Sequence, residues 1–294
     1  MRDLIDFDEN KIRDHYKLYQ ALLDGLGVDI KKEKVPAYGL PQPTEVGSED
    51  DFVKKLLTET KLIRPYIKDV YKYISQTWAD NNHAYVFEKA QAIGLDPRWG
   101  VYPDVTASDT TFEGIFSATD GVIDPNEIKI RAAVNKATYM SSVGRRELPT
   151  IMENNLATRI REDAKEYGAT TKRPRDIAYV DVPALRFFSK VGRINCQVLT
   201  HMDVVYPDVP ILVCTGYEIK GESVTYRPDQ EYLSKVTPVY EELPSWDRQE
   251  IQNTRNINEI PKNARRFLDF MAEKLDTPIL MITTGPRRNQ SINC

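Results

Sequence analysis

The sequence predicts an α/β protein with a central, mostly parallel β-sheet flanked by helices. Three observations carry this prediction. Short apolar runs bounded by turn residues recur along the chain, helical periodicity occupies the stretches between them, and polar loops follow several of the apolar runs. Interleaved helices and buried strands are typical of the α/β class, in which ligands bind beyond the carboxyl ends of the strands.

Residues 1–82 are expected to form a mainly helical segment. Residues 8–24 and 49–80 look helical, and Ser48 followed by acidic residues is a typical helix start. Between these stretches, residues 35–47 contain three prolines and two glycines, which indicates a loop.

Residues 83–294 carry the α/β pattern. The short apolar runs that could form strands are Ala84–Glu88, Ile128–Met140, Arg193–Leu199, Pro210–Ile219 and Pro278–Thr283. The first, third and fifth runs are compact enough to be buried strands of one sheet. Helices are expected at Leu148–Tyr167, Val182–Val191 and Pro261–Leu275. Polar residues follow three strand ends, at Gln91, at His201–Asp203 and at Thr284–Pro286.

The composition excludes several classes of protein. The chain has 294 residues, 41% apolar and 29% charged, as a globular domain with a sizeable core does. A net charge of −4 gives no bulk attraction for nucleic acid, so an anion site has to be built from a few placed arginines. No apolar run approaches about 18 residues, and the first residues are too acidic for a signal peptide. We therefore expect a cytoplasmic protein without a membrane segment.

The chain has three cysteines, Cys196, Cys214 and Cys294. They form neither a spaced metal motif nor an even disulfide set, so we expect them to be small buried side chains in a reducing compartment. The three histidines are scattered along the sequence, which argues against a histidine-based metal site.

The most informative loop, Gly168–Asp176, reads Gly-Ala-Thr-Thr-Lys-Arg-Pro-Arg-Asp. Two hydroxyls, a lysine and two arginines lie within residues 170–175. Pro174 lacks a backbone donor and biases Arg173 toward an extended conformation, so the loop is stiff and dense in donors. Arginine grips a carboxylate or phosphate with two parallel hydrogen bonds. The loop therefore predicts an anion site, with an exposed basic loop as the alternative.

Six segments stand out in order across residues 87–286. They are Phe87-Glu-Lys-Ala-Gln91, Tyr102-Pro-Asp-Val-Thr-Ala-Ser-Asp-Thr-Thr111, Gly168–Arg175, Thr200-His-Met-Asp203, Val239-Tyr-Glu-Glu-Leu-Pro-Ser-Trp246 and Ile282-Thr-Thr-Gly-Pro286. Together they resemble the adenylosuccinate synthetase family. Enzymes of this family join aspartate to inosine monophosphate (IMP) using GTP. The resemblance covers the C-terminal two-thirds of the family pattern and implies a synthetase-like fold. It is loose over the first 80 residues.

The resemblance implies that the aspartate substrate binds to the loop Ala169, Thr170, Thr171, Lys172, Arg173, Pro174 and Arg175. The threonines would donate to its carboxylates and the arginines would neutralise charge, which agrees with a loop dense in donors. Arg173 would also reach IMP, and Arg175 the ribose region of GTP. Lys172 stands where the family has glycine, which removes an easy positive-φ position and predicts a different loop path.

The resemblance implies IMP contacts at Gln91, Thr106, Val143, Gly144 and Arg173. It implies GTP contacts at Arg175, His201, Met202, Asp203, Thr283, Thr284, Gly285 and Pro286. Asp203 would read guanine, because a carboxylate accepts from both N1 and the exocyclic amine, a donor pair that adenine lacks. His201 stands where the family has a lysine whose stem packs on the base, and an imidazole could stack there instead. Taken alone, an Asp after a buried strand is more often a turn or cap residue.

The family's glycine-rich phosphate loop, Gly-Asp-Glu-Gly-Lys-Gly, does not occur in this sequence. The aspartate base, the catalytic histidine and the magnesium ligands of the family belong to that region, so no catalytic residue and no metal ligand is assigned here. We therefore expect a synthetase-like chain whose N-terminal portion is missing, with a separate phosphate-loop polypeptide as one way to complete it.

The family implies GTP and Mg²⁺ as cofactors, IMP, aspartate and GTP as binding partners, and a homodimer. Residues 83–294 would be the nucleotide- and aspartate-binding part of a single synthetase-like domain. Two alternatives stay open. One is a non-catalytic nucleotide- or aspartate-binding paralogue, and the other is a relative that acts on another purine nucleotide such as (d)GMP. The second is suggested by departures from family residues at Lys89, Ala92, Lys172 and Pro174, and Asp109 also departs from the family near the IMP positions.

Overall fold

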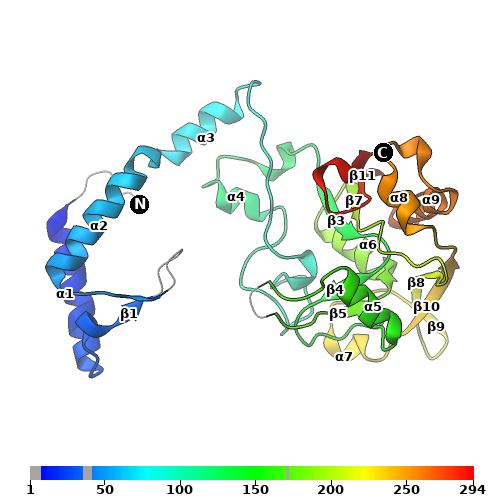
Figure 1. The fold of residues 1–294 in the computed structure, drawn as a ribbon, viewed down its shortest axis with the longest axis horizontal. Coiled ribbons are helices and arrows are strands. Elements are labelled where there is room, and N and C mark those ends of the chain that lie inside the picture. Colours follow the sequence, from blue (N-terminus) through cyan, green and yellow to red (C-terminus); the bar gives the residue numbers. More distant parts are fainter. Residues whose placement is uncertain (1–7, 36–41, 170–171) are drawn as a thin grey trace. The chain divides into compact units, whose positions relative to one another are not determined.

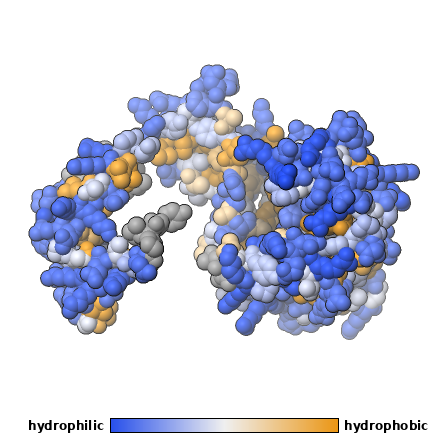
Figure 2. Space-filling model, viewed as in Figure 1, coloured by the Kyte–Doolittle hydropathy of each residue, from blue (hydrophilic) through white to orange (hydrophobic). Residues whose placement is uncertain are grey.

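The structure is a computed structural model that describes residues 8–35, 42–169 and 172–294. The chain divides into two compact units, Met1–Asp80 and Asn81–Cys294. Within the described residues, the first unit is mainly helical, whereas the second mixes helices with strands (Figure 1). Figure 2 shows hydrophobic residues among hydrophilic ones over the helices of the first unit.

The first unit contains α1 (Glu9–Gly25), α2 (Glu49–Ile63) and α3 (Val70–Trp78), with the short antiparallel pair β1 (Lys34–Val35) and β2 (Thr44–Glu45) between α1 and α2. The helix predicted over residues 8–24 is confirmed. The single helix predicted over residues 49–80 is wrong, because the chain breaks between α2 and α3. Pro65 lies in a short 3₁₀ turn after α2, and the Asp69 side chain accepts from Lys72 N to begin α3.

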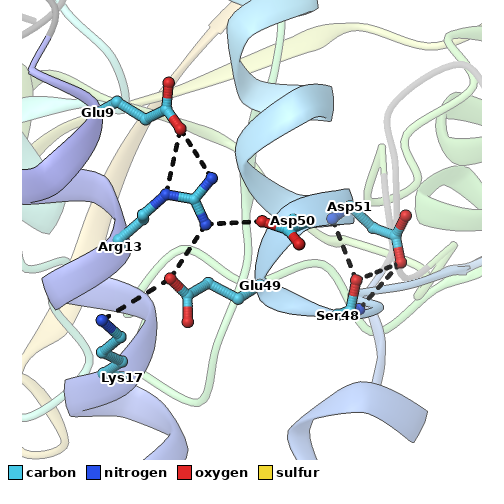
Figure 3. A network of polar contacts seen from close by, with 7 residues as sticks. All are labelled: Glu9, Arg13, Lys17, Ser48, Glu49, Asp50 and Asp51. Atoms are coloured by element: carbon cyan, nitrogen blue, oxygen red, sulfur yellow. Dashed lines mark hydrogen bonds and ion pairs between the residues drawn. The ribbon is translucent and has the colours of Figure 1, made fainter.

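Charged side chains connect α1 to α2 (Figure 3). The Arg13 guanidinium of α1 donates to Glu49 Oε1 at 3.1 Å and to Asp50 Oδ1 at 2.7 Å. The Ser48 hydroxyl and the Asp51 carboxylate form a capping box that begins α2. Because Asp50 is 85% exposed, water screens its ion pair with Arg13. These contacts therefore set how the two helices pair more than they stabilise the unit.

The second unit is built on a mostly parallel sheet, as predicted. Its strand order is β12–β11–β7–β3. The strands are β3 (Ala132–Lys136), β7 (Cys196–Thr200), β11 (Ile279–Thr283) and β12 (Ser291–Asn293). β3 and β11 both pair in parallel with β7, whereas β12 pairs antiparallel with β11. The strands predicted at Arg193–Leu199 and Pro278–Thr283 are confirmed as β7 and β11, in one sheet.

The prediction of a strand at Ala84–Glu88 is wrong. This run has no strand assignment, and Val86 is 93% exposed. A strand needs a neighbour for its backbone donors and acceptors, and no described strand pairs with this run. The strand predicted at Ile128–Met140 is also shorter than expected. Residues 137–139 bend the chain after β3, and β4 (Met140–Ser142) begins a different pairing.

A second, mixed sheet has the order β10–β8–β6, with β9 also paired to β8. Its strands are β6 (Val180–Asp181), β8 (Ile211–Ile219), β9 (Glu222–Val224) and β10 (Thr237–Leu243). β6 runs parallel to β8, and the other two neighbours of β8 run antiparallel to it. The strand predicted at Pro210–Ile219 is confirmed as β8. A separate antiparallel pair joins β4 to β5 (Asp176–Ala178).

Two helices begin and end close to the predicted residues, namely α6 (Val182–Val191) and α9 (Lys262–Leu275). The helix predicted at Leu148–Tyr167 is shorter, because α5 covers only Asn155–Asp163. The Asn154 side chain accepts from the backbone N–H groups of the first turn and fixes where α5 begins. The short helices are α4 (Gly114–Ala118), α7 (Gln230–Leu233) and α8 (Arg248–Asn253).

One apolar core joins these elements. Leu185 of α6 and Phe267 of α9 pack in the same buried cluster as Leu199 of β7, Val213 of β8 and Ile282 of β11. Full burial of an apolar side chain of this size stabilises the fold by about 1.5–3 kcal/mol. The core thus holds the carboxyl ends of β7 and β11 next to each other, where the polar turns at residues 201–203 and 284–286 follow.

β3 is an edge strand of the main sheet within the described residues. Val134 on this strand is 68% exposed and Ile130 just before it is 63% exposed. A cavity of about 940 Å³ lies beside β3, and its lining includes Val134, Lys136, Gln91 and Arg146. Gln91, one of the residues predicted to contact IMP, therefore lies in the wall of a largely apolar cavity.

Two further expectations can be compared with the fold. Cys196 and Cys214 are buried, as expected, but the expectation is wrong for Cys294, which is exposed at the end of the chain. No helix among the described residues is both long enough and apolar enough to cross a membrane.

Candidate functional site

The loop predicted to bind aspartate is closed by backbone pairing. Tyr167 and Pro174 form an antiparallel bridge, and Gly168 N donates to Arg173 O at 2.8 Å. The chain therefore turns back between these pairs. The exposed residues of this turn are Ala169, Lys172, Arg173 and Pro174. Thr170 and Thr171, both predicted to bind aspartate, lie outside the described residues.

Lys172 keeps a conformation that glycine adopts easily. Its φ is 55°, in the left-handed region, and its backbone N–H donates to Gly168 O at 3.0 Å. A left-handed conformation costs a non-glycine residue on the order of 1–2 kcal/mol. The prediction that this lysine removes the positive-φ position is therefore wrong. The closed loop holds the residue there in spite of its side chain.

Arg175 is half-buried and bound to a buried carboxylate. Its Nη1 donates to Glu166 Oε2 at 3.0 Å, and Glu166 is only 3% exposed. Arg161 Nε donates to the Arg175 carbonyl at 2.9 Å and fixes the backbone. Among the described residues, the buried Nε of Arg175 has no hydrogen-bond partner. A fixed guanidinium with a donor to spare suits an added anion.

Glu166 joins this loop to the main sheet. Its Oε1 accepts from Lys136 Nζ at 2.6 Å and from the Tyr139 hydroxyl at 2.7 Å. Burial raises the pKa of the Glu166 carboxyl, but the hydrogen bonds from Lys136 and Tyr139 outweigh burial and bring the pKa below its usual range. Glu166 is therefore a carboxylate at neutral pH. No motif in the sequence marks it, because its partners come from β3 and the bend that follows.

The contacts continue from Tyr139 to His201. The Tyr139 hydroxyl lies 2.9 Å from His201 Nδ1, and the two rings meet edge to face. His201 follows β7 directly and has a φ of 59°. Its backbone N–H donates to Thr283 Oγ1 at 3.3 Å, at the end of β11. Burial and the nearby Lys136 lower the pKa of the imidazole, so His201 is neutral at pH 7.

Asp203, which is predicted to bind the guanine base, is 7% exposed and accepts a hydrogen bond from one neighbouring side chain. Gln252 Nε2 donates to Asp203 Oδ2 at 2.9 Å. A carboxylate offers about four acceptor positions, so this contact leaves others for a base. Trp246 Nε1 donates to the Met202 carbonyl at 2.9 Å and fixes the backbone of the same turn. The carboxylate is therefore positioned by α8 and by the segment before it.

The segment predicted to complete the guanine site lies against the turn that carries Asp203. Met202 N donates to Thr283 O at 3.0 Å, and Thr284 N donates to Gln290 O at 2.8 Å. Thr284 is fully buried and Pro286 is exposed. A Cβ at Gly285 would lie 2.4 Å from the amide end of the Gln290 side chain, so a larger residue here would have to displace that amide. The structure thus brings residues 201–203 together with residues 283–285.

The residues predicted to contact IMP fall into two groups. Ser108 Oγ donates to Gln91 Oε1 at 2.8 Å and lies 3.5 Å from the Thr106 hydroxyl, so Ser108 connects two predicted residues. Val143 and Gly144 form the second group. Val143 is 46% exposed and Gly144 has a φ of 90°. The fifth predicted residue, Arg173, lies on the loop described above.

Arg146 follows the predicted Val143–Gly144 segment, where the sequence left ordinary surface placement equally open, and it connects the two groups. Its Nε donates to Ser142 Oγ at 2.7 Å, next to Val143, and its Nη1 donates to Gly94 O at 2.8 Å, close to Gln91 in sequence. Burial lowers the pKa of the Arg146 guanidinium, which still carries its charge at neutral pH. A half-buried arginine thus contacts both sides of this part of the cavity wall.

The described residues contain no group of three or more His, Cys, Asp or Glu side chains that could hold a metal ion. Mg²⁺ prefers carboxylates and phosphate oxygens as ligands. No chemical step is therefore assigned to the metal here.

Comparisons with known proteins agree with these motifs. A family model described as adenylosuccinate synthetase matches residues 9–292. The chain is 36% identical over 256 residues to the adenylosuccinate synthetase of Lactobacillus johnsonii, covering 87% of this chain and 58% of that protein. It is 34% identical over 250 residues to the adenylosuccinate synthetase of Alkaliphilus metalliredigens, covering 83% of this chain and 57% of that protein.

The fold has a counterpart among solved structures. The structure of fully ligated adenylosuccinate synthetase from Plasmodium falciparum matches with a TM-score of 0.80 and 27% identity, covering 98% of this chain and 64% of that chain. The chain therefore spans less than two thirds of the length of these relatives. The resemblance of the six sequence segments is confirmed over almost all of the chain, which belongs to the adenylosuccinate synthetase family.

Proposed function

We propose that this chain is the aspartate-binding and nucleotide-binding part of an adenylosuccinate synthetase. The completed enzyme would join L-aspartate to IMP with GTP, giving adenylosuccinate, GDP and phosphate. One observation carries the proposal beyond family membership. A continuous set of contacts runs from Arg175 through Glu166 and Tyr139 to His201, and so links the predicted aspartate loop to the predicted guanine site.

The reaction implied by the family has two steps. GTP phosphorylates the purine 6-oxygen, and the amine of aspartate then displaces phosphate. In this proposal, Arg173 and Arg175 neutralise the aspartate carboxylates, Asp203 accepts from guanine, and Gln91 and Thr106 hold IMP. The phosphate loop and the Mg²⁺ ligands would come from the part of the synthetase that this chain does not span, 42% of the Lactobacillus johnsonii protein by difference from the 58% it matches.

The test is an assay of adenylosuccinate formation with IMP, aspartate, GTP and Mg²⁺. The chain is measured alone and mixed with the part of the Lactobacillus johnsonii synthetase that it does not cover. Product from the mixture, and not from either part alone, supports the proposal. Calorimetric titration of the chain alone with GTP and with aspartate is run in parallel. Binding of neither ligand by the folded chain would overturn the proposal.

A matched pair of variants makes the GTP titration specific. Asp203→Asn replaces one acceptor oxygen by a donor and should weaken GTP binding by about ten- to a hundredfold, since hydrogen bonds to charged groups contribute about 1.5–3 kcal/mol. Asp208→Asn changes the same residue type at a site that is 72% exposed, and it should bind GTP as the parent chain does. Equal losses in both variants would remove Asp203 from the guanine site.

The same experiments separate the two alternatives. Binding of aspartate or GTP without turnover in any mixture would identify a non-catalytic binding protein. A clear preference for guanosine monophosphate over IMP in the completed enzyme would identify a relative with a different purine substrate, in line with Asp109 and Lys89 near the predicted IMP site.

A further inference from the structure

Glu166 uses both of its carboxylate oxygens. Oε2 accepts from Arg175 Nη1 at 3.0 Å, and Oε1 accepts from Lys136 Nζ at 2.6 Å and from the Tyr139 hydroxyl at 2.7 Å. The Glu166 side chain is 3% exposed, and Tyr139 is fully buried. Water therefore competes little for these contacts, and each partner has a fixed geometry.

The hydroxyl proton of Tyr139 determines which nitrogen of the neighbouring His201 imidazole is protonated. A phenol has one O–H donor, and a carboxylate can only accept, so the proton of Tyr139 is committed to Glu166. The phenol oxygen still has a lone pair, and His201 Nδ1 lies 2.9 Å from it. A hydrogen bond forms there only if Nδ1 carries a proton. Because the imidazole is neutral, Nε2 is then unprotonated and is an acceptor.

We propose that Glu166 is a positioning residue for both predicted substrate sites. It holds the Arg175 guanidinium directly, and through Tyr139 it fixes His201 in the Nδ1–H form. This inference rests on the proposed function only in naming the ligands of the two sites. The charged groups near His201 are Lys136, Glu166 and Asp203, and the last two do not compete for Nδ1 because Tyr139 occupies it.

Glu166 thus acts along two arms, one directly on Arg175 and one through Tyr139 on His201. The two arms have different consequences. The direct arm fixes the position of the Arg175 guanidinium. Among the described residues, its buried Nε has no hydrogen-bond acceptor. The arm through Tyr139 presents an acceptor nitrogen at the turn next to Asp203. Removing the Tyr139 hydroxyl should therefore disturb the nucleotide site alone, whereas changing Glu166 should disturb both sites.

The first test needs no ligand. Two-bond ¹⁵N–¹H correlation spectra of the ¹⁵N-labelled chain at pH 7.5 distinguish the two neutral forms of each histidine. His201→Gln assigns the signal among the three histidines. We expect an Nδ1–H signal in the parent chain and an Nε2–H signal in Tyr139→Phe. An Nε2–H or doubly protonated His201 in the parent chain would overturn the inference.

A second buried tyrosine provides the matched control. Tyr206 is 9% exposed and its hydroxyl donates to Asp163 Oδ2 at 3.0 Å, in the same apolar cluster as Tyr139. Tyr206→Phe removes a comparable hydrogen bond without touching His201. It should leave the Nδ1–H signal unchanged, which separates a specific effect from general loosening of the fold.

The second test measures ligand affinity by calorimetry. Tyr139→Phe should weaken GTP binding about five- to tenfold, the effect of one hydrogen bond, and leave aspartate binding unchanged. Glu166→Gln should weaken both. Equal losses for both ligands in Tyr139→Phe would contradict the two-arm inference. If the parent chain binds neither ligand but shows the Nδ1–H signal, the proposed function fails and the histidine assignment stands.

Discussion

Asp181 is a buried carboxyl outside the proposed chemistry. It begins α6, where its Oδ1 accepts from Ala184 N at 3.1 Å and its Oδ2 accepts from the Tyr217 hydroxyl. Burial raises its pKa to about 6, although these hydrogen bonds oppose the shift. The folded state therefore binds this proton more tightly than the unfolded chain, whose pKa is about 3.9. The stability that comes from this group is present below about pH 4 and is lost as the pH rises through about 6.

This residue predicts how the pH dependence of stability changes on mutation. Asp181→Asn keeps an acceptor for Ala184 and has no proton to lose. The free energy of unfolding of the variant, relative to the parent chain, should rise by on the order of 3 kcal/mol between pH 4 and pH 7.5. Urea denaturation at several pH values measures it. Parallel curves for the two proteins would show that Asp181 ionises in the fold as it does in water.

Gly285 gives a second prediction at the residue scale. An added methyl group would displace the Gln290 amide, whose Nε2 donates to Gln252 O at 3.2 Å, and Gln252 in turn holds Asp203. Gly285→Ala should therefore weaken GTP binding about tenfold, the effect of one displaced hydrogen bond. Gly216→Ala is the control, because its nearest neighbour, Val239, lies at ordinary contact distance. An unchanged GTP affinity in Gly285→Ala would show that Gln290 does not support the site.

At the scale of elements, three of the five predicted helices and three of the five predicted strands lie close to their predicted residues. α6 lies at its predicted residues because Asp181 caps it and Pro183 lies in its first turn. The strand predicted at Ala84–Glu88 fails for the opposite reason, since a strand depends on a partner that the local sequence does not contain. The helix predicted from Leu148 is too long because Thr150 and Ile151 pair with the chain at Ala178–Tyr179 before the Asn154 cap.

The cap of α5 makes this explanation testable. The Asn154 side chain accepts from Leu156 N at 3.1 Å and from Ala157 N at 3.3 Å. Asn154→Ala should lower the free energy of unfolding by about 1 kcal/mol. Asn258→Ala, at an exposed position in a turn, should change it much less. Thermal or urea unfolding of both variants provides the comparison, and equal effects would mean that the cap does not stabilise α5.

At the scale of the whole molecule, the sequence indicated the family but not how its motifs meet. Arg175 and His201 come from separate motifs, and their link depends on Glu166, Lys136 and Tyr139, which belong to neither motif. Those contacts form only when β3, β7 and the aspartate loop fold together. Candidate site residues could thus be proposed from motifs, whereas the residues that contact and support them in the fold could not.

The open edge of the main sheet also has a consequence at this scale. An exposed parallel edge strand with an apolar side chain is prone to pair with other chains. Val134→Lys on β3 should therefore reduce self-association at high protein concentration, as light scattering after size-exclusion chromatography can measure. Val70→Lys, at a 52% exposed position of α3, is the control outside the sheet. Equal self-association of Val134→Lys and the parent chain would show that β3 does not pair with other chains.

The hydrogen bond from Trp246 to the Met202 carbonyl gives the turn beside Asp203 an optical property. The chain has three tryptophans, Trp78, Trp99 and Trp246, and Trp246 is 3% exposed. Indole emission responds to the polarity and hydrogen bonding around the ring, so a ligand that moves this turn changes the fluorescence of Trp246. With Trp78 and Trp99 replaced by phenylalanine, one intrinsic fluorophore reports occupancy of the turn in unlabelled protein, in real time.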